Sequence, residues 1–257
     1  MRTRALAAAA LLLATVPASG QVATLGDRLI NLPTNLTLGP STFQLLFTHR
    51  FTETVDEAGG KDLFGFDSAA DIGLGVALGL GRSTDVELVR SSFYKEWEAA
   101  CRWTLARQSD AMPVGVGLRV GADYRGASGL TDRWSGFMQL VATRRFAGTL
   151  DVFLVPMFAS DTPTLHNAFN VGVGASYHLP KNWDVEAEIV PENGDARDGQ
   201  LAWAVAINKR LAGHAFLIYL GNSRATTVDM MVGSDFSGGF RSGDVRIGFN
   251  LLRRFPE

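Results

Sequence analysis

Charged residues recur at every second position in several apolar stretches of this 257-residue chain. Alternate side chains of a β-strand point to the same face of a sheet, so these charges would gather on one face. The candidate lumen-lining residues of a barrel built in this way are Glu96, Glu98, Arg102, Arg119, Asp184, Glu186, Glu188 and Arg246. Around a lumen they could form a charged constriction that selects solutes. They could equally pair with one another and close a narrow barrel.

The histidines test an enzymatic alternative. Outer-membrane barrel hydrolases place a histidine and a serine two residues apart on one strand face, which pairs a nucleophile with its base. The residues found two positions after the four histidines are Phe51, Ala168, Pro180 and Phe216. The histidines do not show metal-ligand spacing, and Cys101 is the only cysteine. We therefore expect no enzyme, no catalytic residue, no metal and no cofactor.

Consecutive strands predicted between Ala69 and Leu105 indicate which face is apolar. In the last of them Trp97, Trp103 and Leu105 alternate with Glu96, Glu98, Arg102 and Thr104. Large apolar residues on one face and glycine with charge on the other are typical of a barrel in lipid. The rival is a secreted soluble β-barrel or sandwich, which would turn its apolar face inward.

The same alternation continues from Thr42 to the C-terminal end and predicts about twelve strands. We expect a single closed antiparallel transmembrane β-barrel of the all-β class, with short periplasmic turns and longer outer loops. The connection at Ser92 is an exception, because it is short where a long loop is expected.

Two features of the pattern stay open. Between Trp134 and Arg145 the phase is ambiguous, because Phe137 and Val141 compete with Met138 and Leu140 for the outward face. Inward glycines, among them Gly117 and Gly172, either leave a cavity or permit strong sheet curvature.

The N-terminus reads as a secretory signal peptide, with Arg2 and Arg4 before the apolar run 5–16 and small residues at 18–20. We expect cleavage after Gly20 and a location in the outer membrane of a Gram-negative bacterium. The predicted division is 1–20 as cleaved signal peptide, 21–41 as a periplasmic lead-in or lumen segment, and 42–257 as the β-barrel domain.

Cleavage would leave 22 basic and 26 acidic residues, a net charge of −4 with histidine neutral. This balance does not suit a nucleic-acid-binding protein. The expected partners are outer-membrane lipid and the barrel-assembly machinery during insertion, with an unidentified small solute left open.

Short motifs carry a family resemblance. They are Thr48-His49-Arg50-Phe51, the run 63–68 (Leu-Phe-Gly-Phe-Asp-Ser), and Arg90-Ser91-Ser92 followed by Lys95, Glu98, Arg102-Trp103, Leu105 and Arg107-Gln108. Together they resemble a family of predicted bacterial outer-membrane β-barrel proteins of unknown function. The resemblance implies a barrel and no assigned activity.

The expected function is thus a narrow, charge-lined passive channel or a small-solute binding barrel. Acids at 184, 186 and 188 would give a channel a modest preference for cations. The alternatives are a structural or assembly barrel whose lumen is closed by ion pairs, and a secreted soluble β-barrel.

Overall fold

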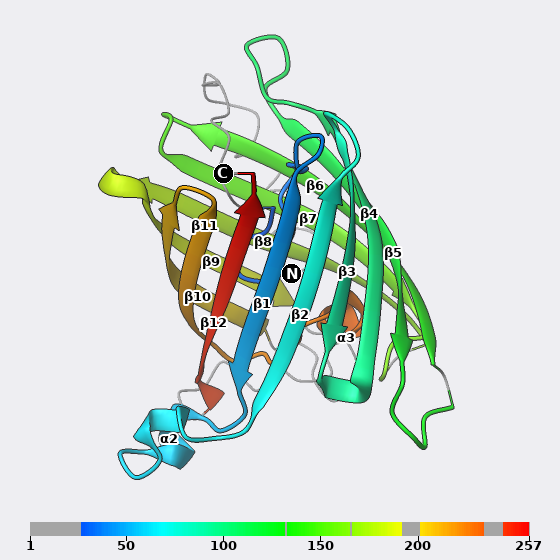
Figure 1. Cartoon of the computed structure of the whole chain (residues 1–257), viewed down its shortest axis with the longest axis vertical. Helices are drawn as coiled ribbons and strands as arrows, with labels where there is room; N and C mark the ends of the chain where they lie inside the picture. Colours follow the sequence, from blue (N-terminus) through cyan, green and yellow to red (C-terminus); the bar gives the residue numbers. More distant parts are fainter. Residues whose placement is uncertain (1–26, 132, 165, 192–200, 234–243, 257) are drawn as a thin grey trace.

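The computed structural model describes residues 27–131, 133–164, 166–191, 201–233 and 244–256. Within these residues twelve antiparallel strands form one closed barrel (Figure 1), as the alternation predicted. The strands are β1 (Phe43–Phe51), β2 (Ala70–Gly79), β3 (Thr84–Ser91), β4 (Glu96–Ala106), β5 (Gly115–Arg125), β6 (Trp134–Phe146), β7 (Leu150–Ser160), β8 (Asn167–Leu179), β9 (Trp183–Pro191), β10 (Leu201–Leu211), β11 (His214–Gly221) and β12 (Arg246–Phe255). Each strand pairs with its neighbours in sequence, and β1 pairs with β12. Closure leaves no sheet edge, so the ladder can satisfy the backbone polar groups that lipid cannot.

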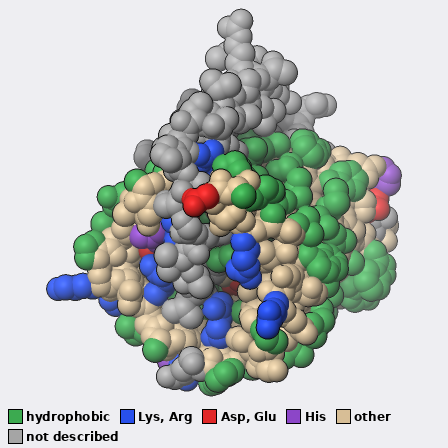
Figure 2. Space-filling model, turned by 90° about the horizontal axis from the view of Figure 1, so that it is seen from above, with side chains coloured by type: hydrophobic (Ala, Val, Ile, Leu, Met, Phe, Trp, Pro, Cys, Tyr) green, Lys and Arg blue, Asp and Glu red, His purple; other side chains and the backbone are tan. Residues whose placement is uncertain are grey.

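The exposed surface of the barrel wall is apolar. Along β2, Leu74 is 56% exposed and Leu78 is 45% exposed, whereas Gly75 and Ala77 between them are buried. Trp97, Trp134 and Trp183 are exposed at strand starts, where aromatic residues anchor barrels at the membrane interface. Viewed from one end, hydrophobic side chains cover the side of the barrel and Lys and Arg side chains spread over the end (Figure 2). This distribution is that of a membrane barrel and not of the secreted soluble alternative.

The connections differ between the two ends of the barrel. Short turns join β2 to β3, β6 to β7, β8 to β9 through η3 (Pro180–Asn182), and β10 to β11. We call this the turn end; the other, the loop end, carries α2 (Val55–Ala58) and η1 (Leu63–Gly65) between β1 and β2, and α3 (Val228–Gly233) between β11 and β12 (Figure 1). The short connection expected after Ser91 is a single 3-10 turn, η2 (Phe93–Lys95). No helix in the described part of the chain has the length and apolar character needed to cross a bilayer.

Strands β6 and β7 turn an apolar row toward the inside. Phe137 and Val141 of β6 are buried, whereas Met138 and Leu140 are exposed, which resolves the ambiguous phase. Phe153, Val155 and Met157 of β7 are buried beside them. The interior is therefore polar around most of the wall but apolar on this side, and something apolar must cover it.

Candidate functional site

The lumen is occupied by the chain's own N-terminal region. Residues 27–39, here called the N-terminal plug, fold back on themselves: the Thr34 N–H donates to the Asp27 carbonyl (2.9 Å) and the Leu29 N–H donates to the Leu32 carbonyl (2.8 Å). Leu29, Leu32 and Leu38 are at most 3% exposed. The sequence left open whether 21–41 is a periplasmic lead-in or a lumen segment. The described part, 27–41, runs inside the barrel and up to its rim. Residues 21–26 lie outside the described residues.

Ion pairs join the plug to β3 and β4. The Arg102 guanidinium lies 2.5 Å from the Asp27 carboxylate and 2.6 Å from that of Asp85, and all three side chains are buried. Arg28 pairs with Glu87. Burial alone would raise the pKa of Asp27, but the Arg102 and Arg28 guanidinium groups hold it below its usual value.

Elsewhere around the wall, β9 and β12 hold the middle of the plug by hydrogen bonds. Glu188 accepts from the backbone N–H groups of Asn31 and Leu32, both at 3.0 Å. The Asn250 amide donates to the Ile30 carbonyl (2.8 Å). These bonds satisfy the Asn31 and Leu32 N–H groups and the Ile30 carbonyl without a neighbouring strand.

The inward glycines make room for this segment. A Cβ atom added at Gly172 would lie 2.7 Å from Cδ2 of Leu32, and one at Gly117 would lie 2.7 Å from Cα of Asn35. The space that the missing side chains leave is thus filled by the plug and not by open lumen.

Apolar contacts complete the fit. Leu29 and Leu32 belong to one buried cluster with Phe137, Val155 and Met157 of the apolar interior wall. On the other side, Ile30 packs in a second cluster, whose remaining members are Ala204, Ala206, Leu217 and Tyr219. The apolar row on β6 and β7 is therefore covered in part by Leu29 and Leu32 of the plug.

Helix α3 enters the lumen from the loop end and packs against β6, β7 and β8. The Val228 N–H donates to Oε2 of Glu98 (2.7 Å), and Asp229 forms an ion pair with Arg125. Val228 and Val232 join the same apolar cluster as the plug's leucines. Burial raises the pKa of the Asp229 carboxyl, although Arg125 favours its charged form.

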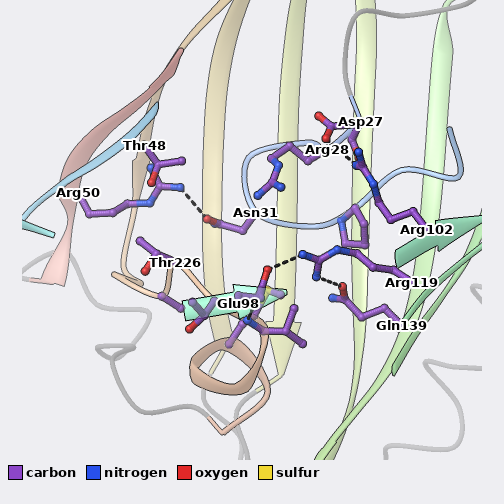
Figure 3. Close-up of a pocket in the computed structure, with 15 residues that line it drawn as sticks. Asp27, Arg28, Asn31, Thr48, Arg50, Glu98, Arg102, Arg119, Gln139 and Thr226 are labelled. Atoms are coloured by element: carbon purple, nitrogen blue, oxygen red, sulfur yellow. Dashed lines mark hydrogen bonds and ion pairs between the residues drawn. The ribbon is translucent and has the colours of Figure 1, made fainter. Parts of the chain in front are cut away.

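Between the plug and α3 a cavity of about 20 Å³ remains. Figure 3 shows Asp27, Arg28 and Asn31 of the plug on one side of it, and Glu98 and Arg119 of the wall facing them. Such a volume holds about one water molecule. In the described residues the lumen is therefore closed between the two segments.

The structure brings four of the predicted lumen-lining residues together on β4 and β5. Arg119 donates to Glu87 (3.0 Å) and pairs with Glu98, and Arg102 pairs with Asp27 and Asp85 as described above. Glu96 is fully buried beside α3 and accepts from the Thr227 hydroxyl (2.8 Å).

The other predicted residues are distributed along the lumen. Asp184 lies near the turn end, with His178 at 2.6 Å and Arg210 at 2.5 Å. Glu186 accepts from Asn208 (2.9 Å), and Glu188 holds the plug. Arg246 is half-buried at the loop end, away from the other predicted residues, and donates to the Thr52 carbonyl (3.1 Å).

Sequence reasoning missed several members of this network. Asp27 and Arg28 lie in a stretch without strand periodicity, and their charged side chains at the start of the plug were the only signal available. Asp123, Arg125 and Asp229 are also buried in the lumen. Asp123 and Arg125 continue the inward phase of Arg119, so the alternation of β5 could have identified them.

Known structures of similar shape are outer-membrane proteins. An outer membrane channel from Pseudomonas putida F1 aligns with a TM-score of 0.52 at 12% identity, covering 91% of this chain and 100% of that one. Outer membrane phospholipase A from Escherichia coli aligns with a TM-score of 0.49 at 12% identity, covering 85% and 92%. The Acinetobacter baumannii outer membrane protein Omp33 aligns with a TM-score of 0.44 at 11% identity, covering 84% of this chain and 98% of that one. At such identities the likeness shows the barrel fold alone.

Curated proteins yield no match to the chain. A family model described as "Membrane bound beta barrel domain (DUF5777)" matches residues 25–255. That range includes the plug and all the described strands, and its description agrees with the resemblance predicted from the motifs. The chain therefore belongs to the membrane bound beta barrel domain family DUF5777.

Proposed function

We propose that this protein is a plugged outer-membrane channel, a passive pathway for small solutes that the N-terminal plug closes at rest. The proposal rests on the partners of the wall groups that hold the plug. Arg102 binds Asp27 of the plug but also Asp85 of the wall, at 2.6 and 3.0 Å. Glu87 binds Arg28 of the plug but also Arg119 of the wall (3.0 Å).

Withdrawal of the plug would thus leave these wall charges paired with one another. Removal of one partner from a buried ion pair is costly because the other charge is left unpaired. This arrangement avoids that cost at both ion pairs between plug and wall. Glu188, which holds the plug by hydrogen bonds, would be exposed to the water that enters. A removable plug over a charged wall is the construction that a gated pathway needs.

The second candidate is a structural or assembly barrel that never opens. Its support is the small free volume, since the cavities between the plug, α3 and the wall measure about 10–20 Å³. In that case the ion pairs would serve to fill the lumen. The two candidates differ in whether the plug ever leaves.

We further propose that the turn end faces the periplasm and the loop end the cell exterior, as is general for outer-membrane barrels. Export would proceed through a signal peptide cleaved after Gly20, in a region outside the described residues, and the barrel-assembly machinery would insert the chain. Catalysis forms no part of the proposed function. Intact-mass measurement of the protein from outer-membrane fractions tests the cleavage site, since Gln21 should be the first residue.

Planar-bilayer recording of the purified full-length protein tests the channel. We expect rare openings in the wild type and frequent openings in the variant Asp27→Asn/Arg28→Gln, which weakens the plug and leaves the wall intact. The matched control is Lys61→Gln/Asp67→Asn, which also removes one charge of each sign, but on the exposed β1–β2 connection.

A covalent lock gives the converse test. The hydroxyl oxygens of Thr37 in the plug and Thr104 in β4 lie 3.1 Å apart, so cysteines at both positions can approach disulfide distance. In a Cys101→Ser background, Thr37→Cys/Thr104→Cys should stay silent when oxidised and open after reduction. If the weakened variant remains silent with verified insertion, the structural barrel stands and the channel does not.

A further inference from the structure

Three carboxylates meet at the loop end of the lumen, outside the contacts made by the plug. Glu96 begins β4, Asp123 lies near the end of β5, and Asp229 comes from α3. One oxygen of each lies within 4.8 Å of the others, and all three side chains are fully buried. Glu96 and Asp123 are brought together by the β4–β5 register, in which Glu98 faces Asp123 and Glu96 faces Arg125.

The groups around this cluster do not neutralise it. Arg125 is paired with Asp229. The Thr227 hydroxyl lies 2.8 Å from Glu96 and 3.0 Å from Asp229, but it carries a single proton to donate. Nearby Glu98 adds a fourth acid, which is occupied by Arg119 and the Val228 N–H.

Asp123 provides the decisive observation. Its side chain is 0% exposed, and neither of its carboxylate oxygens has a hydrogen-bond partner among the described residues. Oε1 of Glu96 also lacks one. Buried carboxylates are ordinarily paired, hydrogen-bonded or bound to a metal. Among the described residues Asp123 has neither an ion-pair partner nor a hydrogen-bond partner.

We propose that Glu96, Asp123 and Asp229 form a calcium-binding site that ties α3 to the barrel wall. An all-oxygen ligand set selects hard cations over zinc or copper. Ca²⁺ takes six to eight oxygen ligands in flexible geometry, whereas Mg²⁺ usually keeps several waters and binds only one or two carboxylates. Three buried carboxylates beside a hydroxyl therefore favour Ca²⁺. The Thr227 hydroxyl and the second carboxylate oxygens can supply the further ligands that Ca²⁺ takes.

The site has a mechanical consequence. Its ligands come from two wall strands and from α3, so a bound Ca²⁺ would cross-link the long β11–β12 connection to β4 and β5. Removal of the ion would leave three carboxylates beside one guanidinium and would loosen α3. The carboxylate site at the loop end is independent of whether the plug opens.

Calorimetric titration of the EDTA-treated full-length protein, refolded in detergent free of lipopolysaccharide, tests the site. We expect binding of one equivalent of Ca²⁺, tighter than the binding of Mg²⁺. Asp123→Asn should weaken Ca²⁺ binding at least about tenfold, whereas the exposed-loop control Asp67→Asn should not change it. The wild-type titration decides the matter even if a variant fails to fold.

Thermal unfolding separates a metal site from acids that merely share protons. Without Ca²⁺, Asp123→Asn should unfold at a higher temperature than the wild type, because it replaces a buried carboxyl that has no partner among the described residues. With Ca²⁺ the order should reverse. If the wild type binds no Ca²⁺, if it prefers Mg²⁺, or if Asp123→Asn is equally stabilised in both conditions, the calcium site is overturned.

Discussion

The backbone of Asn35 crosses strand β5 at Gly117 so closely that a Cβ atom on Gly117 would lie 2.7 Å from the Cα of Asn35. The plug and the wall therefore meet backbone to backbone at this point. A side chain at position 117 cannot be accommodated by rotating a flexible neighbour. The plug would have to move.

Gly117→Ala should consequently loosen the plug. Overpacking typically costs about 1–3 kcal/mol, which corresponds to about a 5- to 150-fold rise in the population of the displaced state. Planar-bilayer recording should show more frequent openings by a factor in that range. Gly81→Ala is the matched control, since nothing lies within 4 Å of a Cβ atom there. Equal opening frequencies for the two variants would contradict the backbone contact.

The lipid face can be tested in the middle of β8. Val173 points outward between Gly172 and Gly174, which face the plug. Val173→Arg should destabilise the folded barrel by about 2–4 kcal/mol if the residue lies near the bilayer midplane. A urea titration of folding into lipid vesicles measures this difference, with Val173→Leu as the control. Similar unfolding midpoints for both variants would mean that Val173 does not face lipid.

Acid should not release Asp27 from Arg102 until the pH is low. The folded-state pKa of Asp27 is lowered. The contribution of Asp27 to plug binding is therefore fully present above the usual aspartate pKa of about 3.9. It is lost only as the pH falls through the folded-state pKa. The difference in opening frequency between wild type and Asp27→Asn should therefore stay constant from pH 7 to about pH 5. This difference isolates Asp27 from the other acids of the lumen. Its loss between those two pH values would show that the ion pair does not hold the plug.

The barrel could be predicted from sequence because most of its strands have one apolar and one polar face. In β4, Trp97 and Leu105 are exposed and Glu98 and Arg102 are buried, as the alternation required. The pattern fails in β6, where Phe137 and Met138 are both apolar. The apolar side chains of the plug and of α3, which share one buried cluster with Phe137, explain why it faces inward.

The closed lumen could not be predicted in the same way. Residues 27–39 bond to side chains of several strands and not to one neighbouring strand, so no period appears in their sequence. Likewise, Asp229 comes close to Asp123 because the β11–β12 connection folds into the lumen. Their spacing along the chain does not predict this proximity. From sequence, the inward glycines either leave a cavity or permit strong sheet curvature. Their contacts with Asn35 and Leu32 add a third role, which is to make room for the plug.

Once the plug has left, the acids of β9 should set the ion selectivity of the lumen. Glu186 is buried and bonded to Asn208, without a basic partner among the described residues, so it would contribute an unpaired negative charge to a water-filled lumen. In the Asp27→Asn/Arg28→Gln background, Glu186→Gln should reduce the preference for cations, read as a smaller reversal potential in a KCl gradient. Glu188→Gln should do the same but should also raise the opening frequency, because Glu188 accepts two backbone N–H groups of the plug. The control is Glu53→Gln, which removes one acid from the exposed β1–β2 connection. If Glu186→Gln leaves the reversal potential unchanged while the channel still opens, the acids of β9 do not set its selectivity.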